Sequence, residues 1–420
     1  MKIWLICQYF KPEVGAPSAR LSGLAKVWQQ EGHHVEVLTS IPNHPQGVIH
    51  ETYKDKGKLY QEGFEGLNVT RYRFYVTPNE GFMKKILSHL HFAWKVLRHN
   101  WKTPAKLPDI MVVSSPSFFV VISTWLLARR HKRPFVFEVR DLWPGIFVEL
   151  GVLKKGFFLT VVEKLELFLY RKATAVITVT KGFAKNIADR GIDPKKLFIV
   201  TNGVSDAEFE TALTPLKDGS VDRLRSELQI NPLTKVLLYI GCHGPSQALG
   251  QIVDAARLMM ARSDVLFLFV GDGADKKRVQ NLAKGMPNIM FVDSQPKERV
   301  WQFYNLAYAS FVPLKDIEGF DTFIPSKMFE IWASKTVVMG CVRGEAADIM
   351  KASKGATVTD PENPEDLAHA IQMLIDRPDR AAELSEHGHN YVQQHYLHSI
   401  LGRKYLGVLE KAVREYNQTS

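Results

Sequence analysis

Short apolar runs alternate with helical patterns along the whole chain. The first run, at 2–8, has the length of a buried strand, and a second strand is predicted at 35–40. Between them, residues 19–31 carry apolar side chains at the spacing of one helix face: Leu21, Leu24, Val27 and Trp28. This alternation of strand and helix predicts parallel α/β architecture.

The alternation continues in two blocks, which are separated by a turn-rich stretch at 202–232. In the first block, strands are predicted at 109–114, 135–139, 175–179 and 197–200. In the second block, they are predicted at 235–241, 265–271, 289–292, 310–313, 337–340 and 356–359, before a mostly helical tail from Pro364. A chain of 420 residues is too long for one ordinary core, so we expect two doubly wound domains that face each other across a cleft.

The expected domains span 1–205 and 206–395, and residues 396–420 are expected to form a C-terminal helix that returns to the first domain. Open α/β sheets bind ligands outside the carboxyl ends of their strands. A cleft between two such sheets would therefore receive one substrate from each side.

Charge is distributed unevenly between the two halves of the chain. Residues 1–200 contain 30 Lys and Arg against 16 Asp and Glu, whereas residues 201–420 contain 24 against 28. The net charge of +10 therefore arises entirely in the first half. The basic first half of the chain is expected to face a polyanion, and the candidates are a phospholipid surface, a nucleic acid and a phosphorylated substrate.

The cysteines and the hydropathy of the chain indicate the compartment in which the protein works. The three cysteines, Cys7, Cys242 and Cys341, lack metal-ligand spacing, which indicates small buried residues in a reducing compartment. The first residues form a strand-length run without the pattern of a signal peptide, and no run of about 20 apolar residues suits a membrane span. We therefore expect a cytoplasmic protein.

Residues 82–102 combine two helical stripes. One stripe is apolar and aromatic: Phe82, Ile86, Leu90, Trp94, Leu97 and Trp101. The other is polar and mostly basic: Lys84, Ser88, His91, Lys95, Arg98 and Lys102, with Lys85 beside it. This pattern is typical of a helix at a membrane interface, and a core-packed helix with a solvated basic face shows it too. The charge asymmetry favours peripheral binding to the inner face of the cytoplasmic membrane, and residues 156–172 repeat the pattern more weakly.

A candidate anion site follows the fourth strand of the second block, in the sequence FDTFIPSKMFEIW at 320–332. Pro325 fits the first turn of a helix, because its missing N–H costs nothing there. The N–H groups, hydroxyl and ammonium of Ser326 and Lys327 would then face an anion. Glu330, one turn further, suits both hydroxyls of a ribose. A capped helix with an exposed Glu is the alternative interpretation.

The loop at 11–18 joins the first strand to the first helix. Gly15 allows backbone N–H groups to approach an anion at the start of that helix. The loop lacks the pattern G-x-G-x-x-G, so it is not a dinucleotide fingerprint. An ordinary strand–helix turn explains the loop equally well.

Together, several segments resemble glycosyltransferase family four, whose members have the GT-B fold, and the resemblance covers essentially the whole chain. The segments are YFKPE at 9–13 with Gly15, GHHV at 32–35, NGV at 202–204, GDG at 271–273 and the segment around Glu330. The resemblance implies retaining transfer of a sugar from a nucleotide-diphosphate sugar. It places the acceptor and the membrane at the N-terminal domain and the donor at the C-terminal domain.

Three further segments resemble the WbuB-like subgroup of that family: PNHP at 42–45, RDLWP at 140–144 and IPSKMFE at 324–330. Members of this subgroup are mostly assigned to O-antigen and capsule assembly, including transfer of N-acetyl-L-fucosamine. A polyprenyl-diphosphate-linked saccharide as acceptor would explain both the membrane-type helix and the charge asymmetry, and the family implies UDP as the carrier of the donor sugar.

Carried over by position, the resemblance implies three catalytic residues. The paired glutamates of the family fall on Thr322 and Glu330, so the first position departs from the pattern. A family histidine falls on Arg140, next to Asp141. An arginine there would stabilise charge that develops on the phosphate, and a structural Arg–Asp pair is the alternative.

The diphosphate clamp also departs from the family. Its Arg and Lys fall on Cys242 and Gln247. We expect Lys327, His243 and the backbone N–H groups around Gly244 to replace them. The full set of expected donor-binding residues is Gly15, His243, Gly244, Ile324, Pro325, Ser326, Lys327 and Glu330.

The chain contains no Asp-x-Asp pair, which metal-dependent transferases of the other major fold use to hold a metal on the diphosphate. We therefore expect a reaction that needs no metal and no further cofactor. The resemblance implies front-face displacement, in which the leaving diphosphate takes the proton of the acceptor. The enzyme would act by positioning and by stabilisation of charge.

Two other functions are compatible with parts of this pattern. A sugar-nucleotide epimerase or hydrolase could have the same fold, but the sequence shows no clear set of acid and base residues for it. A nucleic-acid-binding protein would explain the basic half, but the basic residues lie on a membrane-type helix rather than around stacking platforms. Glycosyl transfer remains the favoured interpretation.

Overall fold

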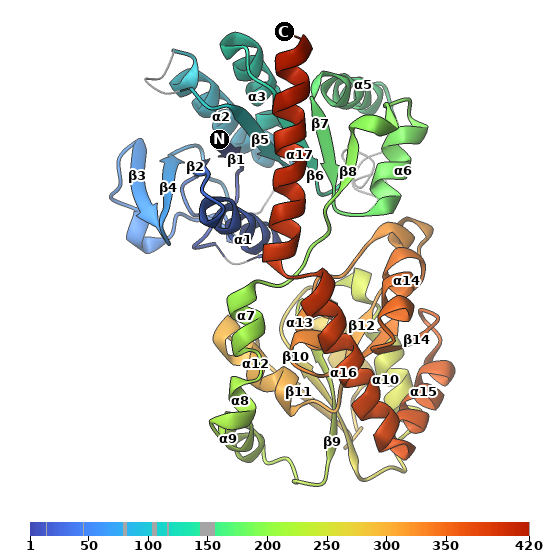
Figure 1. The fold of residues 1–420 in the computed structure, drawn as a ribbon. Coiled ribbons are helices and arrows are strands. Elements are labelled where there is room, and N and C mark those ends of the chain that lie inside the picture. The colour runs from blue at the N-terminus through green and yellow to red at the C-terminus, as the bar shows by residue number, and fades with distance from the viewer. Residues whose placement is uncertain are drawn as a thin grey trace. The chain divides into compact units, whose positions relative to one another are not determined.

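The computed structural model describes residues 1–13, 15–44, 46–78, 82–102, 107–115, 117–142 and 156–419. The chain forms two compact units (Figure 1). Unit 1 comprises Met1–Asn202 and His398–Ser420, and unit 2 comprises Gly203–Leu397. The divisions lie close to 205/206 and 395/396, the boundaries expected from the sequence, and the C-terminal helix belongs to the N-terminal unit.

Unit 1 is built on an eight-stranded sheet with the order β3-β4-β2-β1-β5-β6-β7-β8. Its strands are β1 (Lys2–Ile6), β2 (His34–Ser40), β3 (Leu59–Phe64), β4 (Leu67–Tyr72), β5 (Ile110–Ser114), β6 (Phe135–Val139), β7 (Ala175–Thr178) and β8 (Leu197–Ile199). Its helices are α1 (Ala16–Gln30), η1 (Glu51–Tyr53), α2 (Phe82–Asn100), α3 (Phe118–His131), α5 (Phe157–Lys172), α6 (Lys181–Asp189), η2 (Pro194–Lys196) and α17 (His398–Thr419). All neighbouring strands are parallel except β3 and β4.

Helices bury both faces of the unit 1 sheet, which explains why its strands read as continuous apolar runs. Along β1, Trp4 and Ile6 pack in one cluster with residues of α2 and α3. The alternate residues, Ile3 and Leu5, pack in another cluster with residues of α1 and α17. This alternation follows from the two-residue period of a strand.

Unit 2 is built on a six-stranded parallel sheet with the order β11-β10-β9-β12-β13-β14. Its strands are β9 (Lys235–Ile240), β10 (Val265–Val270), β11 (Ile289–Val292), β12 (Ala309–Pro313), β13 (Val337–Cys341) and β14 (Ala356–Thr359). Its longer helices are α9 (Ser220–Glu227), α10 (Gly250–Leu258), α12 (Lys297–Leu306), α14 (Gly344–Ser353), α15 (Pro364–Asp376) and α16 (Pro378–His395). Its shorter ones are α7 (Asp206–Thr211), α8 (Thr214–Lys217), η3 (Pro245–Gln247), α11 (Lys276–Leu282), η4 (Glu318–Thr322) and α13 (Lys327–Ala333).

The predicted α/β class and two-domain organisation are confirmed, and so are the predicted strands, within one or two residues at their ends. Two expectations were wrong. The hairpin β3–β4 was missed, because β3 alternates between exposed and half-buried residues and carries little apolar signal. The stretch at 202–232 is not a plain turn region, since it forms α7, α8 and α9.

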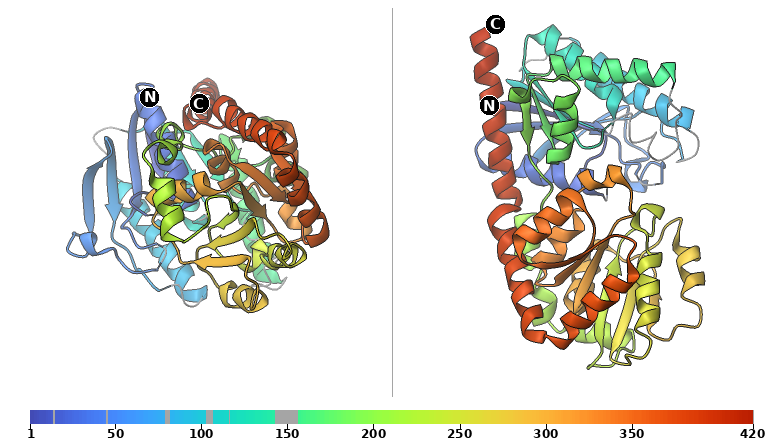
Figure 2. Two further views of the ribbon diagram at one scale, coloured as in Figure 1. Left: turned by 90° about the horizontal axis from the view of Figure 1, so that it is seen from below. Right: turned by 90° about the vertical axis from the view of Figure 1, so that its right-hand side faces the viewer.

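Two glycines allow α17 to pack closely against α1. A Cβ added at Gly402 would lie 2.6 Å from Cγ1 of Val27, and one added at Gly23 would lie 1.9 Å from Nδ1 of His398. Trp28 and Tyr405 pack beside them, with ring centroids 5.0 Å apart. Figure 2 shows α17 in red along one side of unit 1. Close approach of the α1 and α17 backbones at these two glycines therefore fixes the position of α17 on unit 1.

This packing predicts opposite effects for two glycines of α17. Gly402→Ala should lower the free energy of unfolding by about 1–3 kcal/mol, because its methyl group collides with Val27. Gly407→Ala should raise it by about 0.5–1 kcal/mol, because nothing lies within 4 Å of an added Cβ and alanine favours a helix. Urea unfolding followed by circular dichroism measures both, and a Gly402→Ala protein as stable as the parent would contradict the packing.

Candidate active site

Two segments of unit 2 meet at the carboxyl end of β9. Lys327 is the first residue of α13, and its ammonium donates a hydrogen bond to the carbonyl of Ile240 at 3.1 Å. The same ammonium lies 4.2 Å from the centroid of the Tyr239 ring, within cation–π distance. The structure thus brings together the segments 241–247 and 324–330, which the sequence predicted separately as parts of one diphosphate site.

The ammonium of Lys327 is only partly solvated. Burial lowers its pKa to about 8, and the negative charge of Glu330 opposes this shift. A desolvated cation gains free energy when an anion approaches it. Lys327 is therefore well placed to bind a phosphate at this end of the sheet.

A neighbouring turn supports the loop that follows β9. An added Cβ at Gly271 would lie 2.0 Å from the carbonyl oxygen of Gly241, and one at Gly273 would lie 2.5 Å from that of His243. Both glycines have positive φ angles, 135° and 157°. The N–H of His243 donates to the carbonyl of Asp272 at 2.9 Å. Close backbone packing, possible only with glycine, therefore shapes the loop.

His243 differs from its predicted role in the diphosphate clamp. Its side chain is fully buried, with its ring centroid 5.6 Å from that of Tyr239 and 6.3 Å from that of Phe269. Burial also lowers the pKa of His243, which favours the neutral ring. His243 is thus a core residue that offers its backbone, and not its ring, to the loop.

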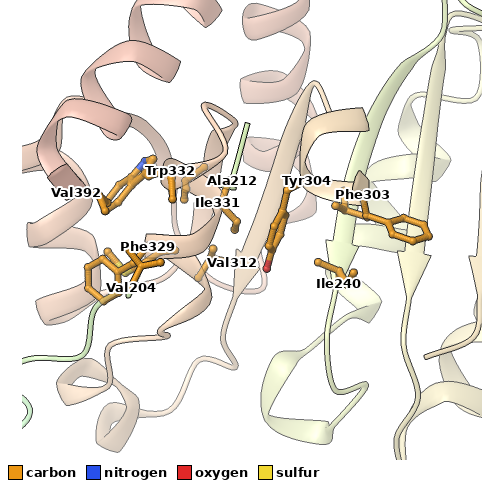
Figure 3. Packing of buried hydrophobic residues seen from close by; sticks show 14 of the residues in the cluster. Val204, Ala212, Ile240, Phe303, Tyr304, Val312, Phe329, Ile331, Trp332 and Val392 are labelled. Carbon is orange, nitrogen blue, oxygen red and sulfur yellow. The ribbon is translucent and has the colours of Figure 1, made fainter. Parts of the chain in front are cut away.

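The carboxylate of Glu330 lies one turn into α13, as predicted. The hydroxyl of Tyr304 donates to it at 3.4 Å, and Figure 3 shows Tyr304 in the same apolar cluster as residues of α13. Burial raises the pKa of Glu330, and the charge of Lys297 opposes this shift. The carboxylate is therefore oriented by a tyrosine and held near a cation.

Lys297 is a candidate that sequence reasoning missed. It forms an ion pair with Glu208, which also accepts a hydrogen bond from the hydroxyl of Ser205 at 2.7 Å. Although burial opposes it, the charges of Glu208 and Glu330 raise the pKa of Lys297. Lys297 starts α12, where a cation is unfavourable to the helix dipole. A lysine at the start of a predicted helix is therefore the feature of the sequence that could have indicated a nearby carboxylate partner.

Three other residues of this segment that were predicted to bind the donor or to act in catalysis are Pro325, Ile324 and Thr322. Pro325 lies just before α13 and not inside its first turn, because Ser326 is the N-cap residue. Ile324 is buried in the core of unit 2. The hydroxyl of Thr322 donates to the carbonyl of Gly319 at 3.2 Å, within η4. The Thr322 hydroxyl therefore bonds to the backbone of its own turn.

The segment around Gly244 carries the two departures from the family's clamp. Cys242 is exposed, and its carbonyl accepts a hydrogen bond from the Tyr239 hydroxyl at 2.6 Å. Gln247 donates to the hydroxyl of Ser246 at 3.3 Å. Gly244 is the N-cap residue of η3. Its backbone thus lies at the same strand end as Lys327.

In unit 1, Arg140 follows β6 in a cluster of buried charges. Glu138 is fully buried and pairs with Arg20 of α1 at 3.2 Å. The N–H of Arg140 donates to the hydroxyl of Ser115 at 2.9 Å. Two of its guanidinium nitrogens, Nε and Nη1, are buried without a hydrogen-bond partner among the described residues, which stop at 142 and resume at 156. The adjacent Asp141 has a pKa raised by burial.

Gly15 is the N-cap residue of α1 and has a φ of 155°. The loop before it is held by Glu13, whose buried carboxylate accepts the N–H groups of Asn43 and His44 at 2.7 and 2.9 Å. It also accepts the N–H of Phe10 at 3.3 Å. Burial raises the pKa of Glu13 to about 7. A single carboxyl group therefore joins the loops that follow β1 and β2.

The helix α2 presents an apolar stripe to solvent that shares Leu90, Trp94 and Trp101 with the predicted stripe and differs from it at other positions. The exposed apolar residues are Met83, Leu87, Leu90, Trp94 and, just beyond the helix, Trp101. Ile86 and Leu97 are half-buried, and Ser88 is buried. The described part of the basic face includes the exposed residues Lys84, Lys85, Arg98 and Lys102, and Lys95 and Arg98 lie 5.4 and 5.0 Å from the Trp94 ring. We call this surface the α2 stripe.

The described residues contain no group of three or more His, Cys, Asp or Glu side chains placed to hold a metal ion. No described helix combines the length and the apolar character that crossing a bilayer requires. RDLWP at 140–144 and PNHP at 42–45 extend into residues outside the described ranges.

Comparisons with known proteins identify a family for each unit. Residues 15–203 match the family "Glycosyl transferase 4-like domain". Residues 220–391 match the family "Glycosyl transferases group 1". The chain is 23% identical over 417 residues to WcaI of Escherichia coli, described as a colanic acid biosynthesis glycosyl transferase, with 96% of this chain and 97% of WcaI covered.

Solved structures share the fold over the full length. Sucrose-phosphate synthase of Thermosynechococcus elongatus matches with a TM-score of 0.73 at 16% identity, covering 100% of both chains. HepE of Anabaena, in complex with UDP and glucose, matches with a TM-score of 0.71 at 15% identity, covering 98% of this chain and 99% of HepE. With both units matched by transferase families, the chain belongs to the family-four glycosyltransferases of the GT-B fold.

Proposed function

We propose that this glycosyltransferase moves a sugar from a UDP-sugar to a polyprenyl-diphosphate-linked saccharide during synthesis of a bacterial surface polysaccharide. The observation that carries the proposal is the partly desolvated ammonium of Lys327 at the carboxyl end of β9. The likeness to HepE, which binds UDP, supports the choice of nucleotide, and the likeness to WcaI supports the choice of pathway. The WbuB-like segments make N-acetyl-L-fucosamine the first donor sugar to test.

The donor diphosphate would bind to Lys327 and to the backbone N–H groups of the loop around Gly244. Glu330 would accept the two hydroxyls of the ribose, as its position within α13 suggests. The Tyr304 hydroxyl donates to that carboxylate, so the ribose hydroxyls would meet a hydrogen-bond acceptor that is already oriented. The site then recognises the nucleotide through the charge of its phosphates and through its ribose.

The proposed reaction is a front-face displacement with retention. The bond between the anomeric carbon and the phosphate oxygen breaks, and the acceptor oxygen bonds to the same face of that carbon. The acceptor proton moves to the leaving phosphate oxygen, so no side chain has to act as a base. Lys327 would stabilise the charge that develops on the diphosphate, which is the main contribution expected of such a site.

No resident metal is proposed at the donor site, because Lys327 offers a cation there. An ammonium neutralises part of the charge of a diphosphate through charge-assisted hydrogen bonds.

The acceptor would reach the enzyme from an anionic membrane. The α2 stripe exposes five large apolar side chains beside basic residues, in unit 1, which carries the basic excess of the chain. Lysine and arginine near aromatic and aliphatic residues are typical of a helix that lies in the membrane interface. Peripheral binding would keep a lipid-linked acceptor close to the site.

The pKa of Lys327 predicts how UDP binding depends on pH. The ammonium is charged below about pH 8 and loses its proton above it, so UDP affinity should fall as the pH rises. Calorimetric titration in EDTA should show an affinity roughly tenfold lower at pH 9 than at pH 7. Lys327→Arg should bind UDP with little change over this range, because a guanidinium stays charged.

A matched variant distinguishes UDP binding by Lys327 from a general effect of removing a positive charge. Lys284 is exposed on the same unit, away from the donor segments, and Lys284→Ala should bind UDP as the parent does. UDP affinity that stays constant from pH 7 to pH 9 would refute the contact with Lys327. So would tight UDP binding by Lys327→Ala, or binding that requires a divalent metal.

The α2 stripe predicts binding to anionic vesicles. The parent protein should sediment with vesicles that contain phosphatidylglycerol, and added salt should weaken this binding. Leu87→Ser combined with Trp94→Ser should lower vesicle affinity about tenfold or more, because two exposed apolar side chains are lost.

The control for this experiment lies in the other unit. Leu233 of unit 2 is 85% exposed, so Leu233→Ser removes a more exposed apolar side chain without touching the α2 stripe. It should leave vesicle binding unchanged. Equal binding by the α2 double variant and the parent would show that another surface meets the membrane.

A further inference from the structure

The segment 241–247, which follows β9, supplies no cationic side chain to a diphosphate. The two clamp positions of the family fall on Cys242 and Gln247, and the segment contains no lysine or arginine. The ring of His243 is buried, and its lowered pKa favours the neutral form. Lys327 would therefore be one cation for two phosphates, which leaves most of their negative charge without a partner.

Lys315 lies at the other end of this segment. It is the second residue after β12, the strand that pairs with β9, and its N–H donates to the carbonyl of Ser246 at 2.9 Å. The ammonium of Lys327 contacts the carbonyl of Ile240, just before the segment begins. The two lysines thus flank the segment 241–247 at the carboxyl ends of neighbouring strands, where open α/β sheets bind their ligands.

We propose that Lys315 supplies the second cation of the donor site and binds the phosphate that carries the sugar. The inference rests on the proposed binding of a UDP-sugar. Lys327 and Glu330 lie about one turn apart on α13, so a ribose at Glu330 would place the phosphate next to it at Lys327. The second phosphate would then extend along the segment 241–247 toward Lys315. A cation at that phosphate would stabilise the oxygen that leaves when its bond to the anomeric carbon breaks.

The loop that carries Lys315 is held in place by its backbone. Besides the bond from Lys315 to η3, the N–H of Asp316 donates to the carboxylate of Glu362 at 2.8 Å. Gly344, with a φ of 62°, packs so closely on the loop that an added Cβ would lie 2.1 Å from the carbonyl oxygen of Asp321. A phosphate that meets Lys315 would therefore not have to order this backbone first.

The side chain of Lys315 is exposed, and the carboxylate next to it in sequence has another partner. Asp316 accepts a hydrogen bond from Arg343 at 2.8 Å, and Arg343 also pairs with Asp360 at 3.2 Å. Within the part of the chain that the structure describes, no carboxylate forms an ion pair with Lys315. A lysine ammonium is a compact charge with three donors on a flexible stem, so it can reach a phosphate beside its loop.

Calorimetric titration of UDP and of UMP, in EDTA, tests this placement, because only UDP has the second phosphate. Lys315→Ala should lower the affinity for UDP about tenfold and the affinity for UMP less than about twofold. Lys315→Arg should keep most of the UDP affinity, since a guanidinium also binds phosphate. Lys327→Ala should weaken the binding of both nucleotides, because its partner would be the phosphate that they share.

Two controls separate a contact with Lys315 from other effects. Lys284→Ala removes an exposed lysine of the same unit and should leave both affinities unchanged. Thermal unfolding of Lys315→Ala without ligand should match that of the parent, because the side chain is exposed. Equal UDP affinities of Lys315→Ala and the parent, or equal losses for UDP and UMP, would overturn the role of Lys315 and leave the donor site at Lys327 standing. Absence of UDP binding by the parent would refute the proposed function, and this inference with it.

Discussion

The proposed donor site depends on one partly buried ammonium group, that of Lys327. Lys327 is the first residue of α13, and its side chain reaches across to the carbonyl at the end of β9 and to the face of Tyr239. This contact fixes α13 against the loop that follows β9 and leaves a cation with a lowered pKa at the carboxyl edge of the sheet. The burial of that charge is unfavourable without an anion, so the proposed site would favour a diphosphate.

The surrounding fold serves to hold this edge rigid. Gly271 and Gly273 allow the turn after β10 to pack its backbone against the backbone of the loop after β9. The ring of His243, which belongs to that loop, is fully buried. Tyr304 donates a hydrogen bond to Glu330, and the charge of Lys297 opposes the rise of the pKa of Glu330 that burial causes. Unit 1 uses a comparable device, since Glu13 ties two loops through three backbone N–H groups. In both units, buried polar groups that are hydrogen-bonded set the shape of a site at strand ends.

The sequence predicted the fold well because long apolar runs and helix periods mark elements that are buried on one or both faces. It also placed Lys327 and Glu330 on one helix, since that follows from local spacing. It failed where the answer depended on contacts between distant segments. The ring of His243 looked available but packs against Phe269. Lys297 was missed because its partner Glu208 lies far away in sequence. In α2, which packs on α3, Leu90 and Trp94 are exposed as predicted, but Ser88 is buried and Leu87 is exposed, so the exposed stripe agrees with the predicted one only in part.

In the proposed donor complex, a nucleoside diphosphate binds between the loop after β9 and the start of α13. Hydrogen–deuterium exchange with and without UDP, in EDTA, tests this placement, because the slowing of exchange reports the segments that the ligand contacts or orders. We expect slower exchange in peptides that cover 241–247 and 324–330. Slower exchange confined to other segments, or no change at saturating UDP, would contradict it.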